Sequence, residues 1–440
     1  MKKSTTKISL VASIAALVLC CAMLIGTTFA WFTDSASTAV NKIQAGTLDV
    51  QLLDESGNSL EGQTLAWQKA AGHESEEVLW EPGCTYKLQP IVIKNNGNLA
   101  LKYKIVITGI QGDAELNEAI EWTITNTSAT TALDADHPLA AGASDTLTIS
   151  GHMKESAGNE YQGLSIEGIA ITVVATQDTV EHDSNDNTYD KDAEYPVAAN
   201  TQAELNDVIA SAQSGSAIPT KVVLPAGNFK LEDGTAQNKN ITISGTADTV
   251  VTVVGDTGNQ LNYQNGATLA FEGVTIQGQT AGDFGGIAHV AKTTFVNCTF
   301  NGKLTLYGDA TFINCTFNNK SDYAIWTWGA KNAEFIGCTF NSGGKALLLY
   351  GGAGSTETPT TNLTVTDCVF DDDNTLTTDK AAIEIGNDYD AVYNLTVNNI
   401  IVTGFAENPA GISTGSTIWA NKNSMDQDHL NVVIDGVDVY

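Results

Sequence analysis

An acidic stretch in the last quarter of the chain holds the residues best suited to chemistry. It contains, in order, Asp371, Asp372, Asp373, Lys380, Asp388 and Asp390. Neighbouring carboxylates can hold a calcium ion, and a lysine beside them can remove a proton from a bound substrate. A run of aspartates is also typical of a solvated loop between strands, and we favour that interpretation. The catalytic candidates of the chain are Asp371, Asp372, Asp373 and Lys380.

A second set of possible metal ligands lies in residues 178–194, which carry seven acids and one lysine. Asp183, Asn185, Asn187, Tyr189 and Glu194 occupy positions 1, 3, 5, 7 and 12 of a calcium-loop pattern. The sixth position, where the sharp turn of such a loop needs glycine, is a threonine, and no helical pattern flanks the segment. Calcium is a possible ligand here, although an acidic segment also produces such a match by chance.

The histidines do not have the spacing of a zinc site. A zinc-binding helix needs two histidines four residues apart, with a glutamate directly after the first. His73 and Glu74 are followed by Ser75, Glu76 and Glu77, so the second histidine is missing. We therefore expect no cofactor other than the possible calcium.

The charge of the chain excludes some classes of partner. All 21 basic residues are lysines, and the 51 acidic residues bring the formal net charge to -30. Residues 31–199 hold 26 acids and 8 lysines, and residues 200–440 hold 25 acids and 10 lysines. Such a field repels polyanions, so neither nucleic acid nor an anionic lipid surface is expected as a partner. The 42% share of hydrophobic residues is typical of packed domains.

Residues 1–30 have the pattern of a secretory signal peptide. Lys2, Lys3 and Lys7 precede the apolar run at 8–25. Small residues follow this run, before a cleavage site between Ala30 and Trp31. A retained membrane helix is the alternative, but the run is short for a span. We expect a secreted protein, extracellular or associated with the cell surface, that has no membrane segment after processing.

The spacing of strand patterns predicts two all-β domains. Residues 31–177 contain short β-rich runs separated by turn residues, as in a β-sandwich of the jelly-roll kind. Residues 178–199 form an acidic linker. Residues 200–212 then have a helical pattern, with Thr201 placed as its N-cap and Leu205 and Ile209 on one face. Cys84 is the single cysteine of the first domain, either a partly buried thiol or a loop thiol able to cross-link subunits.

A repeated strand motif decides the fold of residues 200–440. Its clearest copies, at 295–300, 312–317 and 335–340, read Phe-x-x-Cys-Thr-Phe, and weaker copies follow as far as 434–439. A constant motif with spacers of variable length predicts coils that share a strand position, which is a right-handed parallel β-helix. The helix at 200–212 would cap its N-terminal end. A propeller would need blades of even length.

The repeat also assigns roles to cysteines and tryptophans. The cysteines at one place in the motif, Cys298, Cys315, Cys338 and Cys368, would stack in a line about 4.8 Å apart, so we expect a buried apolar ladder rather than a tetrahedral metal site. Trp326 and Trp328 could form a sugar-stacking platform. Aligning Trp326 with Leu348 and Ile383 places the tryptophans in the core instead, and we favour the core.

The first domain resembles the TasA/camelysin family of bacterial secreted matrix proteins. The resemblance rests on Thr-Phe-Ala-Trp-Phe-Thr-Asp at 28–34, Ala-Gly-Thr-Leu-Asp-Val at 45–50, Trp-Glu-Pro-Gly at 80–83 and the Asn-Asn-Gly-Asn turn at 95–98. It covers about residues 1–175. It implies processing by the signal peptidase dedicated to this family, and a sandwich that can form fibres by lending its N-terminal strand to a neighbour. The appended second domain is a large departure from the family.

Residues 200–440 are similar to the pectate-lyase-like superfamily, on the phrases Thr-Gln-Ala-Glu-Leu at 201–205 and Leu-Pro-Ala-Gly-Asn at 224–228. The resemblance implies the fold, and fold alone does not transfer activity. A polysaccharide lyase of this fold would normally use an arginine or lysine base. The absence of arginine from the chain leaves only lysine.

We therefore predict a structural or adhesive protein of the bacterial surface or extracellular matrix, whose β-helix presents a face for glycans or proteins. Fibre formation through its N-terminal strand is one expected property. Self-association and glycans are its expected interactions. The alternative is a β-helix carbohydrate-active enzyme, a lyase or a glycosidase, tethered to a matrix module. We favour the protein without enzymatic activity.

Overall fold

The computed structural model describes most of residues 48–440. Its gaps are residues 61–62, 64, 77, 109–110, 114, 127–128, 168–169, 179–180, 183–185, 187, 190–193, 217–218, 233–238, 255–259, 263–266, 279–283, 289–291, 320–323, 328–331, 343–344, 351–359, 372–376, 387–390 and 407–413. Several predicted positions lie outside the described residues: Ala30, Trp31, Asp183, Asn185, Asn187, Trp328, Asp372, Asp373, Asp388 and Asp390.

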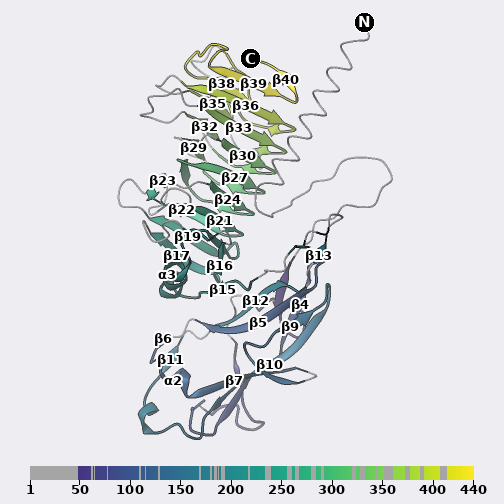
Figure 1. Ribbon diagram of the computed structural model, residues 1–440, viewed down its shortest axis with the longest axis vertical. Coiled ribbons are helices and arrows are strands. Elements are labelled where there is room, and N and C mark those ends of the chain that lie inside the picture. The colour runs from purple at the N-terminus through teal and green to yellow at the C-terminus, as the bar shows by residue number, and fades with distance from the viewer. Residues whose placement is uncertain are drawn as a thin grey trace, which may run out of the picture.

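The first domain consists of two antiparallel sheets, at the lower end of Figure 1. The larger sheet has the order β1 (Val50–Leu53), β4 (Ile91–Asn95), β10 (Ser144–Met153), β3 (Thr85–Leu88) and β2 (Trp67–Gln68), and β10 also pairs with β7 (Ile120–Asn126), which pairs with β8 (Thr130–Ala132). The smaller sheet has the order β12 (Ala170–Gln177), β5 (Leu101–Thr108) and β9 (His137–Leu139). Shorter elements are β6 (Gln111–Gly112), α2 (Glu115–Glu118), η1 (Asn159–Tyr161) and β11 (Ile166–Glu167).

Alternation of apolar and polar residues explains the core of this domain. In β4 the side chains of Ile91 and Ile93 are buried, and those of Val92 and Lys94 between them are more exposed. Successive residues of a strand face opposite sides of a sheet, so this pattern fixes which side packs inward. Ile124 and Ile149 of the same sheet meet Ile105 of β5 in one buried cluster. The described part is therefore a β-sandwich, as predicted.

The segment between the domains contains local structure and rests on the sandwich. It includes the pair β13 (Glu181–His182) and β14 (Thr188–Tyr189), then β15 (Val197–Ala198), which is already part of the second domain. The Tyr195 hydroxyl donates to Asp136 Oδ1 over 3.2 Å, and the Lys104 ammonium lies 4.7 Å from the centre of the Tyr195 ring. Burial raises the pKa of the Tyr195 phenol, so this hydroxyl remains a donor at neutral pH.

The second domain is a right-handed parallel β-helix of three long sheets (Figure 1). The first sheet comprises β15, β16 (Thr220–Val223), β18 (Ile241–Ser244), β21 (Thr268–Glu272), β24 (Lys292–Val296), β27 (Asp309–Ile313), β30 (Asn332–Ile336), β33 (Thr360–Thr366), β36 (Val392–Asn398), β39 (Leu430–Ile434) and β40 (Val437–Asp438). The second comprises β17 (Gly227–Glu232), β19 (Thr249–Val254), β22 (Thr275–Gly278), β25 (Thr299–Phe300), β28 (Thr316–Phe317), β31 (Thr339–Phe340), β34 (Val369–Phe370) and β37 (Ile401–Val402). The third comprises β20 (Gln260–Asn262), β23 (Phe284–Ala288), β26 (Lys303–Leu306), β29 (Ile325–Thr327), β32 (Leu347–Leu349), β35 (Ile383–Ile385) and β38 (Trp419–Asn421).

The repeated motif sets the register of these sheets. Phe295, Phe312 and Phe335 lie directly above one another in the first sheet, with ring centres 4.8 and 4.5 Å apart. The second phenylalanine of each copy forms a parallel stack in the second sheet, running from Phe300 to Phe370. Both stacks are buried. The prediction of an all-β fold with a parallel β-helix is confirmed.

The turn within the motif requires an unusual backbone conformation. Asn297, Asn314, Asp367 and Asn399 occupy the same place in successive coils, each with a positive φ near 50°. Asparagine and aspartate tolerate this left-handed conformation better than other residues with a side chain. Gly337 fills the same place in its coil, where a Cβ atom would lie 2.5 Å from Asn314 Oδ1.

A helix closes the start of the β-helix. In α3 (Gln202–Ser211), Thr201 accepts a hydrogen bond from the Glu204 amide, and the Glu204 side chain accepts one from the Thr201 amide. This capping box satisfies two amides that have no partner inside the helix. Leu205 and Ile209 are buried against the first coils, so the predicted cap is confirmed. No helix in the described ranges is long and apolar enough to span a membrane.

Replacing Phe335 with alanine is expected to lower the free energy of unfolding of the β-helix by about 3–5 kcal/mol, because it opens a cavity between the Phe312 ring and Val365. Denaturant unfolding followed by circular dichroism measures the change. Thr364→Ala, on the outward side of the same sheet, is the control and should cost about 0.5 kcal/mol. Equal losses in the two variants would contradict the role given to the stack.

Candidate functional site

The first residue of the acidic stretch, Asp371, is buried and does not lie on the surface. Asp371 is 2% exposed and follows β34, with a positive φ of 64°. Its amide donates to the Phe340 carbonyl over 2.7 Å, just as the Asn341 amide donates to Phe317 in the coil below. Asp371 is thus a corner residue of the coil. Lys380 precedes β35, and its carbonyl accepts from the Ala406 amide.

Tyr189 and Glu194 are the two residues of the calcium-loop pattern that the structure describes. Tyr189 pairs with Glu181 across β13 and β14, and Glu194 is exposed. Within the described ranges, no three His, Cys, Asp or Glu side chains come close enough to hold a metal ion. Calcium binding by Asp183, Asn185 and Asn187 stays a prediction.

The four motif cysteines form the buried ladder that their spacing predicts. Cys298, Cys315, Cys338 and Cys368 are each 1% exposed and form no disulfide. Each thiol contacts a carbonyl oxygen of the neighbouring coil, for example Cys298 Sγ with the Phe271 oxygen over 3.3 Å. Burial raises the pKa of the Cys315 thiol. The ladder is part of the core, and its thiols are closed off from solvent.

The outward row of the third sheet is the most suggestive group of side chains. Strand pairing aligns Thr305, Trp326, Leu348, Glu384 and Ala420 in successive coils. Their neighbours Ile325, Leu347 and Ile383 belong to the buried core, so the row faces away from it. The placement of Trp326 in the core was wrong. The structure aligns Ala346 with Ala382 and not with Ala381. Glu384, rather than Ile383, therefore lies in register with Leu348.

Glu384 is the charged centre of this row. Its side chain is 3% exposed, and its Oε2 atom lies 3.3 Å from Lys345 Nζ and 3.7 Å from Lys422 Nζ. Lys345 is 16% exposed and Lys422 47% exposed, so one ammonium is nearly enclosed and the other reaches solvent. A buried carboxylate needs such partners to remain ionised. Two ammonium groups around one carboxylate also leave a local positive charge on a strongly acidic protein.

Aromatic rings adjoin the same row. Trp326 is half-buried, and its ring meets that of Tyr350 edge to face, with centres 5.4 Å apart. Aromatic faces pack against the apolar face of sugar rings, while carboxylate and ammonium groups hydrogen-bond hydroxyls. Thr305, Leu348, Glu384 and Ala420 are buried, so contact of this row with a polar ligand that has an apolar face falls to the half-buried Trp326 ring and the exposed Lys422 ammonium. Glycosidases need two carboxylates across the bond that breaks, and Glu384 is the single carboxylate of these five aligned residues.

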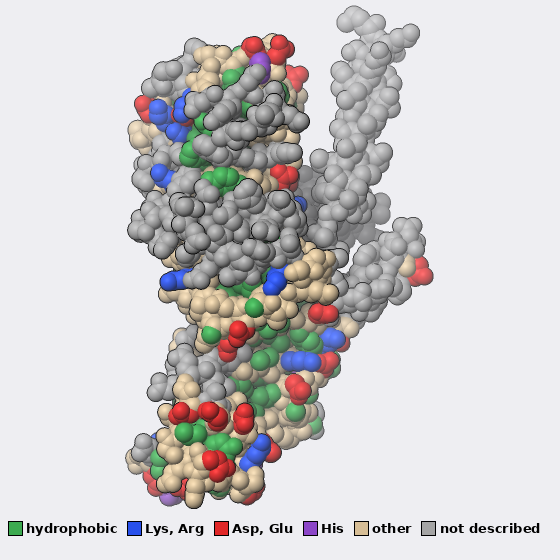
Figure 2. All heavy atoms as spheres, turned by 60° about the vertical axis from the view of Figure 1, so that its left-hand side comes forward, with side chains coloured by type: hydrophobic (Ala, Val, Ile, Leu, Met, Phe, Trp, Pro, Cys, Tyr) green, Lys and Arg blue, Asp and Glu red, His purple; other side chains and the backbone are tan. Residues whose placement is uncertain are grey.

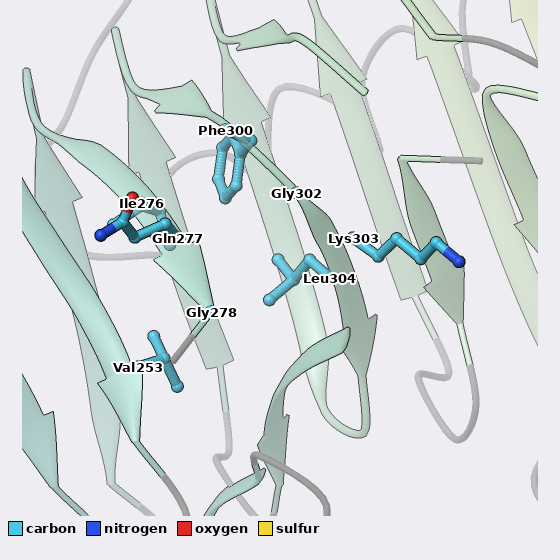
Figure 3. A pocket seen from close by; sticks show the side chains of 8 residues that line it. All are labelled: Val253, Ile276, Gln277, Gly278, Phe300, Gly302, Lys303 and Leu304. Carbon is cyan, nitrogen blue, oxygen red and sulfur yellow. The ribbon is translucent and has the colours of Figure 1, made fainter. Parts of the chain in front are cut away.

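A cavity at the corner between the second and third sheets is too small to be a site. It measures about 10 Å³ and is lined by Val253, Ile276, Gln277, Gly278, Phe300, Gly302, Lys303 and Leu304. Figure 3 shows the Lys303 side chain extending away from the others. A volume of this size holds one water molecule at most.

The sequence pattern did not relate Glu384 to Lys345, to Lys422 or to Trp326. Lys345 and Lys422 lie in spacers that the repeat does not align, and only strand pairing brings them to Glu384. Glu384 was assigned correctly to the outward side, but the one-residue error in its register separated it from Trp326. Because residues 381 and 382 are both alanine, either of them can be aligned with Ala346, and the sequence alone does not distinguish the two registers.

Comparisons with known proteins match both halves of the chain. The family described as "Right handed beta helix region" matches residues 232–425, and the family described as "Camelysin metallo-endopeptidase" matches residues 5–57. These matches support the fusion that the sequence suggests. The segment matched to camelysin contains no histidine.

Comparisons with individual proteins add little. No curated protein matches the chain. The solved structure entitled "Crystal structure of Agl-KA catalytic domain" is 10% identical and covers 91% of this chain and 100% of its own, with a TM-score of 0.21. A TM-score that low supports no conclusion about fold or activity.

Replacing Glu384 with alanine is expected to lower the free energy of unfolding by about 2 kcal/mol, because it leaves the enclosed Lys345 ammonium without its carboxylate. Lys422→Ala should cost less than about 1 kcal/mol, since that ammonium is half exposed. Thermal or urea unfolding of the two variants measures both effects. The opposite order would show that Lys422 rather than Lys345 anchors the carboxylate.

Native protein treated with iodoacetamide should be modified at Cys84, which is half-buried, and not at the four ladder cysteines. All five should react once guanidinium unfolds the chain. Mass spectrometry of tryptic peptides locates the label, and Cys84→Ser should remove the reaction of the native protein. Labelling of Cys315 before unfolding would contradict the closed core.

Proposed function

We propose that this chain is a secreted protein of the bacterial cell surface or extracellular matrix, and that its β-helix binds a glycan along the outward row of the third sheet. The match of residues 5–57 to the camelysin family supports the first part. The cluster of Glu384, Lys345 and Lys422, which lies two coils from Trp326 along the same row, supports the second. This cluster is the observation that carries the proposal.

The chemistry of the cluster favours binding over cleavage. The carboxylate is held by two ammonium groups and can accept hydrogen bonds from hydroxyls, while Trp326 supplies an apolar face. The exposed end of Lys422 can reach a ligand in solvent. Since a second carboxylate does not belong to the aligned row, hydrolysis lacks one of its two usual groups there.

In this proposal, the sandwich domain mediates the assembly of copies of the chain into fibres. Strand β1 is the terminal strand of the larger sheet and pairs with β4; on its other side Leu53 forms a bridge with Ser59, and the Leu52 carbonyl accepts from the Leu60 amide. An edge strand has unpaired main-chain groups that can accept a further strand from another copy. Residues 31–47 precede β1 and are the segment that would be lent. Electron microscopy of the mature protein, with and without residues 31–47, tests fibre formation.

Wild-type protein applied to a panel of immobilised bacterial polysaccharides should retain at least one of them, and Trp326→Ala should weaken that binding about tenfold, because the stacking surface is lost. Lys345→Ala should do the same. Thr364→Ala, on the outward side of the first sheet, is the matched control.

Failure of every polysaccharide in the panel to bind would overturn the glycan proposal. Shortening of a bound polysaccharide, abolished by Glu384→Gln, would show that the chain is an enzyme instead. Chromatography of the polysaccharide before and after incubation distinguishes the two outcomes.

A further inference from the structure

Four aromatic side chains gather at one end of the sandwich, far along the chain from the β-helix row. They are Trp67, Trp80, Tyr86 and Trp122. Trp67 and Trp122 stack with centres 6.0 Å apart, and Trp80 lies 5.4 Å from Trp67 and 5.2 Å from Tyr86. Below, these four residues are called the aromatic end.

The aromatic end lies on the core side of the larger sheet, where its rings are half-buried. Trp67 and Trp122 pack against the sandwich core, and Trp80 packs against a small cluster that contains Leu116 and Met153. In β7, Ile124 is fully buried, whereas Trp122, two residues earlier on the same side, is only half-buried. In β10, Ile149 is fully buried, and Gly151 pairs with Trp122. A Cβ atom on Gly151 would lie 2.7 Å from the Trp80 ring. The glycine thus lets Trp80 lie close to the sheet.

An exposed leucine and several carboxylates surround the aromatic end. Leu79 is 57% exposed, and its carbonyl accepts from the Tyr86 hydroxyl over 2.9 Å. Glu81 follows Trp80 and is exposed, and the Glu155 side chain, which is 82% exposed, approaches the same loop at Gly83. Figure 2 shows hydrophobic side chains at the lower end of the molecule with carboxylates around them.

The lysines near this end do not neutralise the carboxylates. The Lys69 ammonium donates to the carbonyls of Glu74 and Glu76, and the Lys154 ammonium donates to the Glu118 carbonyl over 2.7 Å. Both cations are therefore directed at backbone oxygens. His73 contacts Glu76 and His152 contacts Glu155.

We propose that the aromatic end, with Glu81 and Glu155 at its rim, binds a lysine- or arginine-bearing segment of another protein. Tryptophan and tyrosine are the residues that most often anchor protein interfaces, and their ring faces attract cations. The carboxylates add charge complementarity. A second copy of this chain is a poor occupant, because it is itself acidic and contains no arginine.

The test uses the mature protein and a fluorescent arginine–serine repeat peptide, with a glutamate–serine peptide of equal length as the negative probe. Fluorescence anisotropy should show binding of the first peptide alone. Trp80→Ala, and separately the double variant Glu81→Gln/Glu155→Gln, should each weaken it about tenfold. The double variant leaves the aromatic packing intact, so it answers the question even if Trp80→Ala does not fold.

Two control variants separate this surface from general acidity and from the glycan site. Asp207→Asn removes an exposed carboxylate of α3, and Trp326→Ala removes the ring of the β-helix row; both should leave peptide binding unchanged. Equal binding by wild type and the double variant would overturn the proposal. So would binding of oligoglucosamine in place of the peptide with the same dependence on Trp80, or sedimentation showing that copies associate through this end.

Discussion

The stacking of parallel strands at a spacing of about 4.8 Å is the constraint on which the second domain depends. A residue at one place in a coil must pack against the residue at the same place in the coils on either side. Phenylalanine therefore lies on phenylalanine, cysteine on cysteine, and the residues with positive φ form a line along one corner. Spacer length is not under this constraint. The coils can differ widely in loop length while their strands remain in register.

The same constraint explains what the sequence could predict. The Phe-x-x-Cys-Thr-Phe copies encode the first two sheets and the corner between them, so the fold and the burial of the four cysteines were predicted correctly. The third sheet has no such motif. Its strands contain three to five residues and follow spacers of unequal length, so a one-residue shift at Ala381-Ala382 could not be detected. That shift reverses which side of the sheet a residue faces.

The candidate site depends on residues that only the folded chain brings together. Lys345, Glu384 and Lys422 come from three coils, and no pattern in the sequence relates them. The same is true of the aromatic end, whose four rings come from β2, β3, β7 and the loop before β3. The acidic runs that stand out in the sequence proved less informative. Asp371, the one aspartate of its run whose structure is described, is a corner residue inside the coil.

The contact of Tyr195 with Lys104 and Asp136 has a consequence for any assembly of this protein. Because the segment that enters the β-helix is held against β5 of the sandwich, the two domains are not joined by a free tether. Sandwiches arranged in a regular fibre would then carry their β-helices at a common angle and a constant interval. Such a fibre would display its ligand-binding rows as an ordered array, and a weak individual contact would be multiplied along a polymeric ligand.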